Sequence, residues 1–263
     1  MKKIREVEIV KHNFSTKKTQ KTTDFIAEEK PIHIFVNKTF WATILCSPFE
    51  LTELAIGHLL SEGIIESIKE ITDIILDEEN SCFVNLHPKI NVKERIGLSR
   101  LHQRVVTSAC GGQSAYQFSR KPKKITSKLN VAAKIIFEAV KQLNFKAKTY
   151  KQTGGVHAAA LYNSKGLLVA IAEDVGRHNA VDKAIGIVAV KEISFDDLFL
   201  ASTGRLSGDI VFKAAKLGIP IVASLGAALD SGVQMAKKAN LTLTGFVRGN
   251  RINIYTYPNR ILL

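Results

Sequence analysis

Short apolar runs separated by polar turns mark the first third of the chain as a small α+β unit. Alternating apolar positions predict four strands, at residues 32–37, 40–45, 71–76 and 82–86. Between the second and third strands, Ser47-Pro48-Phe49-Glu50 predicts a helix start, with Ser47 as the cap and Pro48 at the first helical position. Leu51, Leu54, Ala55 and Leu59 then share one face, and Gly63 is expected to end the helix.

Strand-like and helical patterns alternate in the second half of the chain. Ala132, Ile136, Ala139, Val140 and Leu143 predict an amphipathic helix. Strands are expected at residues 157–162, 167–172, 198–202, 219–224, 241–247 and 252–257. Helices are expected from about residues 177 and 206, and at 227–239. This alternation predicts an α/β layered domain with some parallel pairing. We therefore expect an N-terminal α+β domain at 1–127 and a C-terminal α/β domain at 128–263.

Charge is concentrated in one segment of the 263-residue chain. The net charge is +13, and residues 89–151 hold fifteen Lys and Arg side chains against Glu94 and Glu138. Such a segment is typical of a surface that binds nucleic acid, a phosphorylated cofactor or an acidic protein. A solvated linker is the alternative. Few aromatic residues are interleaved and no nucleic-acid recognition motif is present, so nucleic acid is the least favoured partner.

Composition excludes several classes of protein. No apolar run approaches the roughly 20 residues that cross a bilayer, and the N-terminus lacks the apolar core of a secretory signal. The three cysteines are too few for a disulfide scaffold and fit a reducing cytoplasm. Cys46 and Cys82 lie in apolar strand patterns that predict burial.

Cys110 is the candidate nucleophile. It precedes Gly111-Gly112 inside the basic segment, where a flexible chain gives access and positive charge favours the thiolate. An incidental loop thiol is the alternative.

Glycine-bearing junctions follow several expected strands. Those at residues 173–178 and 202–205 carry Arg177 and Arg205, and backbone N–H groups at such junctions bind anions. At 245–251 an aromatic residue beside two arginines suits a base and a phosphate. Ordinary tight turns and an edge hairpin are the alternatives, since neither a P-loop nor a G-x-G-x-x-G pattern is present.

Several titratable residues lie near these junctions. His157 and His178 raise the question of zinc, but the spacing of a zinc hydrolase site is missing. Asp174, Asp182 and Lys183 are either catalytic groups or structural ion pairs, and the sequence leaves both open.

Residues 173–183 spell EDVGRHNAVDK, which closely resembles the signature of the formate dehydrogenase accessory sulfurtransferase family. The likeness continues at 54–65 (LAIGHLLSEGII), 107–110 (TSAC), 153–159 (TGGVHAA) and 203–215 (TGRLSGDIVFKAA). It extends from about residue 32 to residue 260.

The resemblance implies a cytoplasmic sulfurtransferase. It would take persulfide sulfur from a cysteine desulfurase and pass it to a molybdenum or tungsten bis-molybdopterin guanine dinucleotide cofactor, before that cofactor enters formate dehydrogenase. It also implies a homodimer, a C-terminal domain of the cytidine deaminase fold without zinc or another metal of its own, and no membrane partner. The implied sulfur carrier is Cys110, and the expected cofactor contacts are Phe246, Val247, Arg248, Gly249, Asn250, Arg251, Arg177, His178 and Arg205.

Two single positions and one four-residue segment depart from the family pattern. Gln113 replaces a usual second cysteine, His58 replaces a usual aromatic residue, and Leu225-Gly226-Ala227-Ala228 replaces a usual Ser-Ala-Pro-Thr. A single thiol suffices for persulfide relay, but not for a mechanism that resolves an internal disulfide. The absence of the second cysteine, replaced by Gln113, supports an alternative function: a cofactor-binding chaperone without sulfur transfer.

Overall fold

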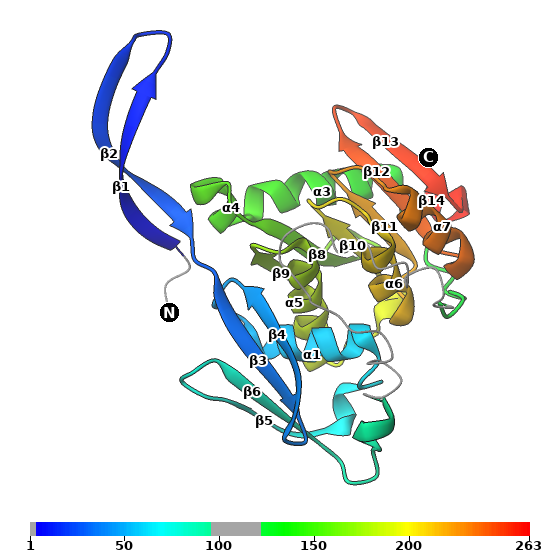
Figure 1. The fold of residues 1–263 in the computed structure, drawn as a ribbon. Helices are drawn as coiled ribbons and strands as arrows, with labels where there is room; N and C mark the ends of the chain where they lie inside the picture. The colour runs from blue at the N-terminus through cyan, green and yellow to red at the C-terminus, as the bar shows by residue number, and fades with distance from the viewer. Residues whose placement is uncertain (1–3, 96–121) are drawn as a thin grey trace.

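The computed structural model describes residues 4–95 and 122–263 as a mixed α/β protein (Figure 1). Cys110 and Gln113 lie outside the described residues. The first body of the fold is a four-stranded sheet in the order β4-β3-β6-β5. Its strands are β3 (Lys30–Val36), β4 (Thr39–Cys46), β5 (Ile71–Leu76) and β6 (Ser81–Leu86). The central pair, β3 and β6, is parallel and the outer pairs are antiparallel. All four strands confirm the sequence prediction.

Helix α1 (Leu51–Glu62) lies on this sheet, and the 3₁₀ helix η1 (Ile68–Glu70) follows it. Gly63 ends α1 in the left-handed conformation, as predicted. The predicted start was wrong, because the residue at the helix cap is Glu50 and its side chain makes no capping bond. Ser47 is not free to cap α1, since its backbone and hydroxyl groups bond to Asp174 and Val175 on the other half of the chain.

The second body is a six-stranded sheet in the order β13-β12-β11-β10-β8-β9. Its strands are β8 (His157–Asn163), β9 (Leu168–Asp174), β10 (Leu198–Ser202), β11 (Ile221–Ser224), β12 (Thr242–Arg248) and β13 (Arg251–Thr256). Strands β10, β11 and β12 are parallel, which confirms the expected parallel pairing. The outer pairs are antiparallel. Small elements complete the domain: β7 (Val131–Ala132) pairs with β14 (Ile261–Leu262), and η3 (Phe195–Asp197) and η4 (Pro258–Arg260) are short 3₁₀ turns.

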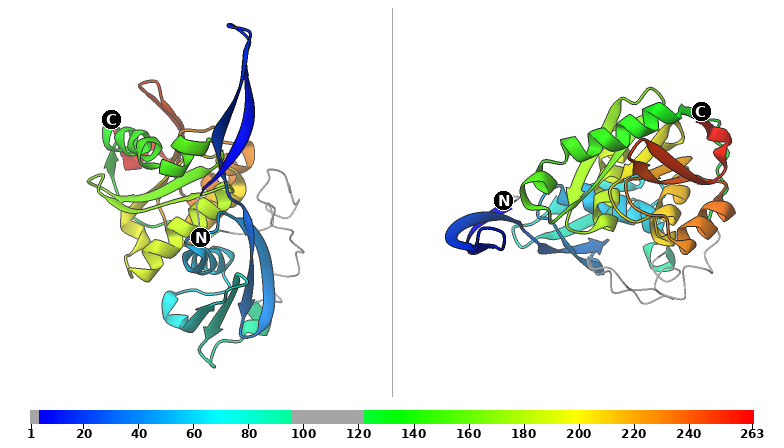
Figure 2. Two further views of the ribbon diagram at one scale, coloured as in Figure 1. Left: turned by 90° about the vertical axis from the view of Figure 1, so that its left-hand side faces the viewer. Right: turned by 90° about the horizontal axis from the view of Figure 1, so that it is seen from above.

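Helices cover both faces of this sheet, because alternate strand residues point to opposite sides. In β8, Ala159 and Leu161 join the apolar cluster beneath one set of helices, whereas Ala160 and Tyr162 join the cluster beneath α3. Figure 2 shows α3 lying across its own face of the sheet. The helices are α3 (Ala133–Lys146), α4 (Lys148–Thr153), α5 (Arg177–Val190), α6 (Gly208–Lys216) and α7 (Asp230–Ala239). The short helix α4 has no counterpart in the sequence prediction.

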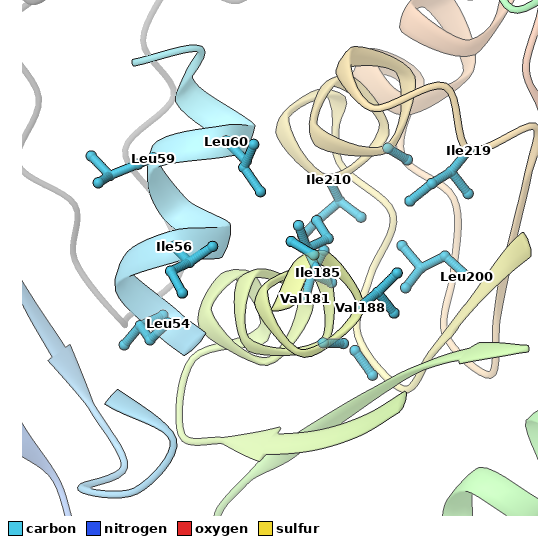
Figure 3. Packing of buried hydrophobic residues seen from close by; sticks show 14 of the residues in the cluster. Leu54, Ile56, Leu59, Leu60, Val181, Ile185, Val188, Leu200, Ile210 and Ile219 are labelled. Atoms are coloured by element: carbon cyan, nitrogen blue, oxygen red, sulfur yellow. The ribbon is translucent and has the colours of Figure 1, made fainter. Parts of the chain in front are cut away.

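A single apolar core joins the two sheets. Helix α1 crosses α5 and also contacts α6 (Figure 3). At the crossing, a Cβ atom on Gly57 would overlap the carbonyl oxygen of Asp182, and one on Gly186 would overlap that of Glu53. The two backbones are therefore in direct contact. Buried side chains run without a break from Ile34 through Leu54 to the central sheet.

A long two-stranded ribbon precedes the first sheet. Strands β1 (Ile4–Asn13) and β2 (Lys18–Ala27) pair antiparallel over their full length. The ribbon extends away from the body (Figures 1 and 2), and β2 contacts α4 at its base. The sequence analysis assigned no element to these residues. Across the described parts of the chain, no helix combines the length and apolar character that a membrane span requires.

Candidate functional site

The EDVGRHNAVDK segment ties the two halves of the fold together. Asp174 and Lys183 form a completely buried ion pair, with 2.8 Å between Lys183 Nζ and Asp174 Oδ2. Both residues also bind Ser47, whose N–H donates to Asp174 (3.0 Å) and whose carbonyl oxygen accepts from Lys183 (2.9 Å). Asn179 donates to Asp174 and to the carbonyl oxygen of Leu45. This geometry favours the structural interpretation of Asp174 and Lys183.

A second buried network surrounds Asp182. Lys213 Nζ lies 2.7 Å from Asp182 Oδ1, Ser61 donates to the same oxygen (2.8 Å), and His58 Nδ1 is 3.3 Å from Oδ2. Burial alone would raise the pKa of Asp182, but the charge of Lys213 and the bond to His58 hold that pKa at about 2. The network joins α1, α5 and α6. His58, the departure from the family pattern, therefore contributes to a buried polar contact between the halves.

The carboxyl ends of the parallel strands form a tightly packed edge. After β10, the loop at Gly204 leaves no room for a side chain, since an added Cβ would lie 2.9 Å from Arg177 Cβ. After β11, an added Cβ on Gly226 would lie 2.8 Å from the carbonyl oxygen of Gly204. Within β12, where the pairing register shifts after Gly245, the N–H of Phe246 donates to the carbonyl oxygen of Gly226 (2.9 Å). Two loops and the irregular part of β12 thus stack backbone against backbone where ligands collect in α/β sheets.

Two arginines and a histidine gather at this edge. Thr203 Oγ1 hydrogen-bonds with His157 Nδ1 (3.4 Å), and the stem of Arg177 packs on Gly204. Burial lowers the pKa of His157, and the positive charges of Arg177 and Arg205 lower it further. The group therefore combines two permanent positive charges with a neutral imidazole at neutral pH, which suits an anionic ligand. The structure brings together the predicted residues Arg177 and Arg205.

His178 belongs to a different environment. Burial lowers the pKa of His178 to about 3, and the largest charge contribution to that shift comes from Lys213, followed by Arg177. His178, one of the predicted cofactor contacts, is therefore a neutral imidazole at neutral pH.

The β12–β13 hairpin holds the remaining predicted contacts. The guanidinium groups of Arg248 and Arg251 lie 5.2 and 5.7 Å from the ring centre of Phe246. Gly249 and Asn250 form the two-residue turn with φ values of 58° and 57°. Phe246 itself has a φ of 50°, a strained conformation for an aromatic residue that is typical of functional sites. Val247 points into the core beneath α3, so its side chain is not available to a surface ligand.

Residues 27–262 match the model of the FdhD/NarQ family. The chain belongs to this family. It is 36% identical over 250 residues to the sulfur carrier protein FdhD of Shouchella clausii, covering 91% of each chain. It is 37% identical over 245 residues to the FdhD of Saccharolobus solfataricus, covering 92% of each. The crystal structure of a formate dehydrogenase accessory protein from Desulfotalea psychrophila matches with a TM-score of 0.79 and 27% identity, over 98% of this chain and 99% of that one. These matches confirm the resemblance found in the sequence.

Two of the three cysteines of this FdhD/NarQ family member are packing residues. Cys46 and Cys82 are 1% and 0% exposed, and burial raises the pKa of each thiol to about 12. Neither can reach a partner protein or supply a thiolate at neutral pH. The prediction that both are buried is confirmed.

Sequence reasoning missed the structural partners of the site. His157 was considered as a zinc ligand, whereas in the structure its ring hydrogen-bonds with Thr203 and the charges of Arg177 and Arg205 lower its pKa. Lys213 was not singled out, although a lysine among the apolar positions of residues 210–215 was a usable signal. Ser47 and Asp174 are 127 positions apart, so no local pattern could have paired them.

The two histidines with lowered pKa values predict acid sensitivity. Below the ordinary histidine pKa of about 6.5, the unfolded chain binds protons that the folded protein excludes, so stability falls as pH falls. We expect the free energy of unfolding to drop between about pH 7 and pH 5, by about 1.4 kcal/mol per pH unit for a fully excluded proton. Urea unfolding across this range measures it. His178→Gln is expected to flatten the slope, and an unchanged slope would contradict the assignment.

Proposed function

We propose that this chain is a sulfur carrier required for formate dehydrogenase activity. Cys110 accepts persulfide sulfur from a cysteine desulfurase and passes it to the molybdenum or tungsten bis-molybdopterin guanine dinucleotide cofactor, so the protein acts as a sulfurtransferase. The observation that carries this proposal is the family match over residues 27–262, with relatives named sulfur carrier protein and a structural neighbour named formate dehydrogenase accessory protein.

The proposed chemistry is nucleophilic relay through one sulfur. The Cys110 thiolate attacks the terminal sulfur of the donor persulfide, a new S–S bond forms, and the donor cysteine leaves as a thiolate. The carrier persulfide then gives its outer sulfur to the cofactor and Cys110 leaves as a thiolate. The reduced metal of that substrate supplies the two electrons that convert the sulfur to sulfide. No second cysteine is needed, which agrees with Gln113.

Elimination supports the choice of Cys110. The chain has three cysteines, and two of them are buried thiols with pKa values near 12. A sulfur carrier must present a thiolate to both a donor and an acceptor. Cys110 is the cysteine left for that role.

The edge of the central sheet supplies the proposed cofactor site. Arg177 and Arg205 would bind phosphate oxygens, and Phe246 with Arg248 and Arg251 would hold a base and its phosphate. The loop at Gly204, on which the stem of Arg177 packs, and the β12 strand at Phe246 both contact Gly226. A dinucleotide could therefore span them, with Gly249, Asn250 and the backbone of Val247 as neighbours. His178, a neutral imidazole at neutral pH, would be a further contact of the cofactor.

The finer architecture is also a proposal. Strand order and the helices on both faces of the central sheet support a cytidine-deaminase-like C-terminal domain at 128–263, joined to the N-terminal domain at 1–127. We further propose that the protein acts in the cytoplasm as a homodimer.

A direct test is intact-mass measurement after incubation with a cysteine desulfurase and cysteine. We expect an adduct of one sulfur atom that maps to Cys110 and disappears on reduction. A cofactor-binding chaperone would show no adduct, although the names of the relatives favour the carrier. Absence of an adduct in the presence of an active desulfurase would contradict the carrier function.

The same site predicts nucleotide selectivity. We expect the purified protein to bind GDP better than ADP, measured by calorimetry, because the proposed cofactor carries guanine. Arg248→Ala should weaken GDP binding by about 1.5–3 kcal/mol, through loss of a charge-assisted contact. Arg5→Ala, an exposed arginine on the N-terminal ribbon, is the matched control and should change nothing. Equal binding of GDP and ADP, or none, would remove the nucleotide assignment.

A further inference from the structure

The outer face of the four-stranded N-terminal sheet carries exposed apolar side chains. Alternate residues of a strand point to opposite faces, and the inner set, which includes Ile34, Cys82 and Val84, packs into the core with helix α1. A sheet with one solvated face normally carries polar residues on that face. The outer face here instead carries Phe40, which is 45% exposed, and Ile75, which is 52% exposed. Neither side chain belongs to the described core.

Four apolar side chains form one row across all four strands of this sheet. Phe40 of β4 is the register partner of Phe35 on β3, which pairs in turn with Phe83 on β6. Ile75 on β5 pairs with Phe83 and completes the apolar row. The rings of Phe35 and Phe83 stack with their centres 4.9 Å apart, and the ring of Phe40 meets Phe35 edge-on at 5.6 Å. At about 4.8 Å between strands, the row is roughly 14 Å long.

Acidic side chains border the Ile75 end of the apolar row. The β5–β6 hairpin, residues 71–86, has no cationic side chain and holds four carboxylates, those of Asp73, Asp77, Glu78 and Glu79. The net charge of the chain is +13 and that of the hairpin is −4, so the remaining residues carry +17. The opposite hairpin, residues 30–46, carries two lysines and no carboxylate. An acidic border repels nucleic acid and anionic membranes, and it attracts a protein surface that carries Lys or Arg.

We propose that the apolar row and its acidic border are the docking surface for the protein that donates sulfur, the cysteine desulfurase. This inference rests on the proposed function, in which sulfur passes from a persulfide on a protein to a small-molecule cofactor. The two partners need two surfaces, and the edge of the six-stranded sheet is assigned to the cofactor. On the donor, apolar side chains cover the row, and Lys or Arg side chains lie beside the acidic hairpin.

The composition of this surface is that of a protein interface. Aromatic side chains are enriched at the centres of interfaces, where a few of them carry most of the binding energy. The stacked rings of Phe35 and Phe83 already hold each other in place, so they lose little freedom when a partner covers them. The four carboxylates lie at one end of the row only, and they therefore also fix the orientation of the donor.

Affinity for a purified cysteine desulfurase, measured by calorimetry with the full chain, tests the apolar row. Phe40→Ser combined with Ile75→Ser removes the two exposed ends of the row, and we expect the Kd to rise at least about 30-fold. Phe145→Ser is the matched control. Phe145 is an aromatic residue of α3 that is 61% exposed, and its substitution should leave the Kd unchanged.

A second variant keeps every apolar side chain and tests the charge. Asp73→Lys, Glu78→Lys and Glu79→Lys together reverse the exposed carboxylates of the hairpin. Asp77 is kept, because its carboxylate accepts backbone N–H groups of the turn. We expect the Kd to rise about tenfold or more at low salt, and less at high salt because screening weakens exposed charges. Thermal unfolding equal to that of the wild type shows that docking, and not folding, is lost.

Sulfur loading of Cys110 separates this proposal from the proposed function. Both variants should need more desulfurase for half-maximal loading and should reach the wild-type extent at saturation, because docking is weakened and the chemistry is kept. Wild-type affinity in both variants would overturn the docking surface, and loading of Cys110 would still uphold the carrier function. Variants that lose binding only to formate dehydrogenase, or change only the oligomeric state, would also overturn it. A desulfurase that neither binds nor loads the wild type overturns both proposals.

Discussion

Cys110→Ala should abolish maturation of formate dehydrogenase while leaving the fold intact. Sulfur transfer needs a thiolate that reaches both donor and acceptor, and the two other thiols are buried with pKa values near 12. Gln113 stands at the usual position of the second cysteine, so no neighbouring thiol can substitute. The measurement is formate dehydrogenase activity in a strain that lacks its own accessory protein and expresses the variant.

Cys46→Ala and Cys82→Ala are the matched controls. Each removes a buried sulfur, so each should lower stability by about 1–2 kcal/mol through a small cavity while retaining activity. Comparable expression and thermal unfolding of Cys110→Ala and the wild type separate lost chemistry from lost protein. If Cys110→Ala still supports maturation, sulfur transfer is not the role, and the chaperone alternative takes its place.

Local patterns in the sequence predicted most of the fold. The strands at 32–37, 40–45 and 198–202 were found because alternating or continuous apolar runs leave a local signal. The ribbon at 4–27 was missed, since it adds little to the core and its strands lack a buried face. The prediction that Ser47 caps α1 was wrong because the backbone N–H of Ser47 donates to the carboxylate of Asp174, which lies 127 positions away in the sequence. Tertiary contacts thus overrode local capping.

The candidate site was also predictable from the sequence only where a local pattern carried the signal. Cys110 and the arginines at 177, 205, 248 and 251 were predicted from residue type and neighbouring glycines, and their roles stay predictions. The influence of Arg205 on the pKa of His157 depends on the antiparallel pairing of β8 and β10, which a local pattern does not encode. The roles of Asp174, Asp182 and Lys183 stayed open in the sequence because their partners, Ser47 and Lys213, lie on distant elements.

The α1–α5 crossing should be the least tolerant point of the fold. Gly57→Ala or Gly186→Ala places a Cβ inside a backbone carbonyl of the facing helix, and the backbone cannot rotate away as a side chain does. Each substitution must push the helices apart, which also stretches the bonds of Asp182 with His58 and Ser61. We expect a loss of about 3 kcal/mol or more from each, measured as the free energy of unfolding in urea.

Gly249→Ala provides the control, because nothing lies within 4 Å of its added Cβ and only its left-handed conformation, with φ of 58°, opposes the change. That strain costs about 1–2 kcal/mol. The Gly57→Ala/Gly186→Ala double variant should lose less than the sum of the single losses, since helices already separated by one methyl group admit the second. Full additivity would mean that the two glycines do not share one contact. Equal losses at Gly249 and Gly57 would mean that the helices can separate freely, and the α1–α5 contact would then not be what holds the two halves together.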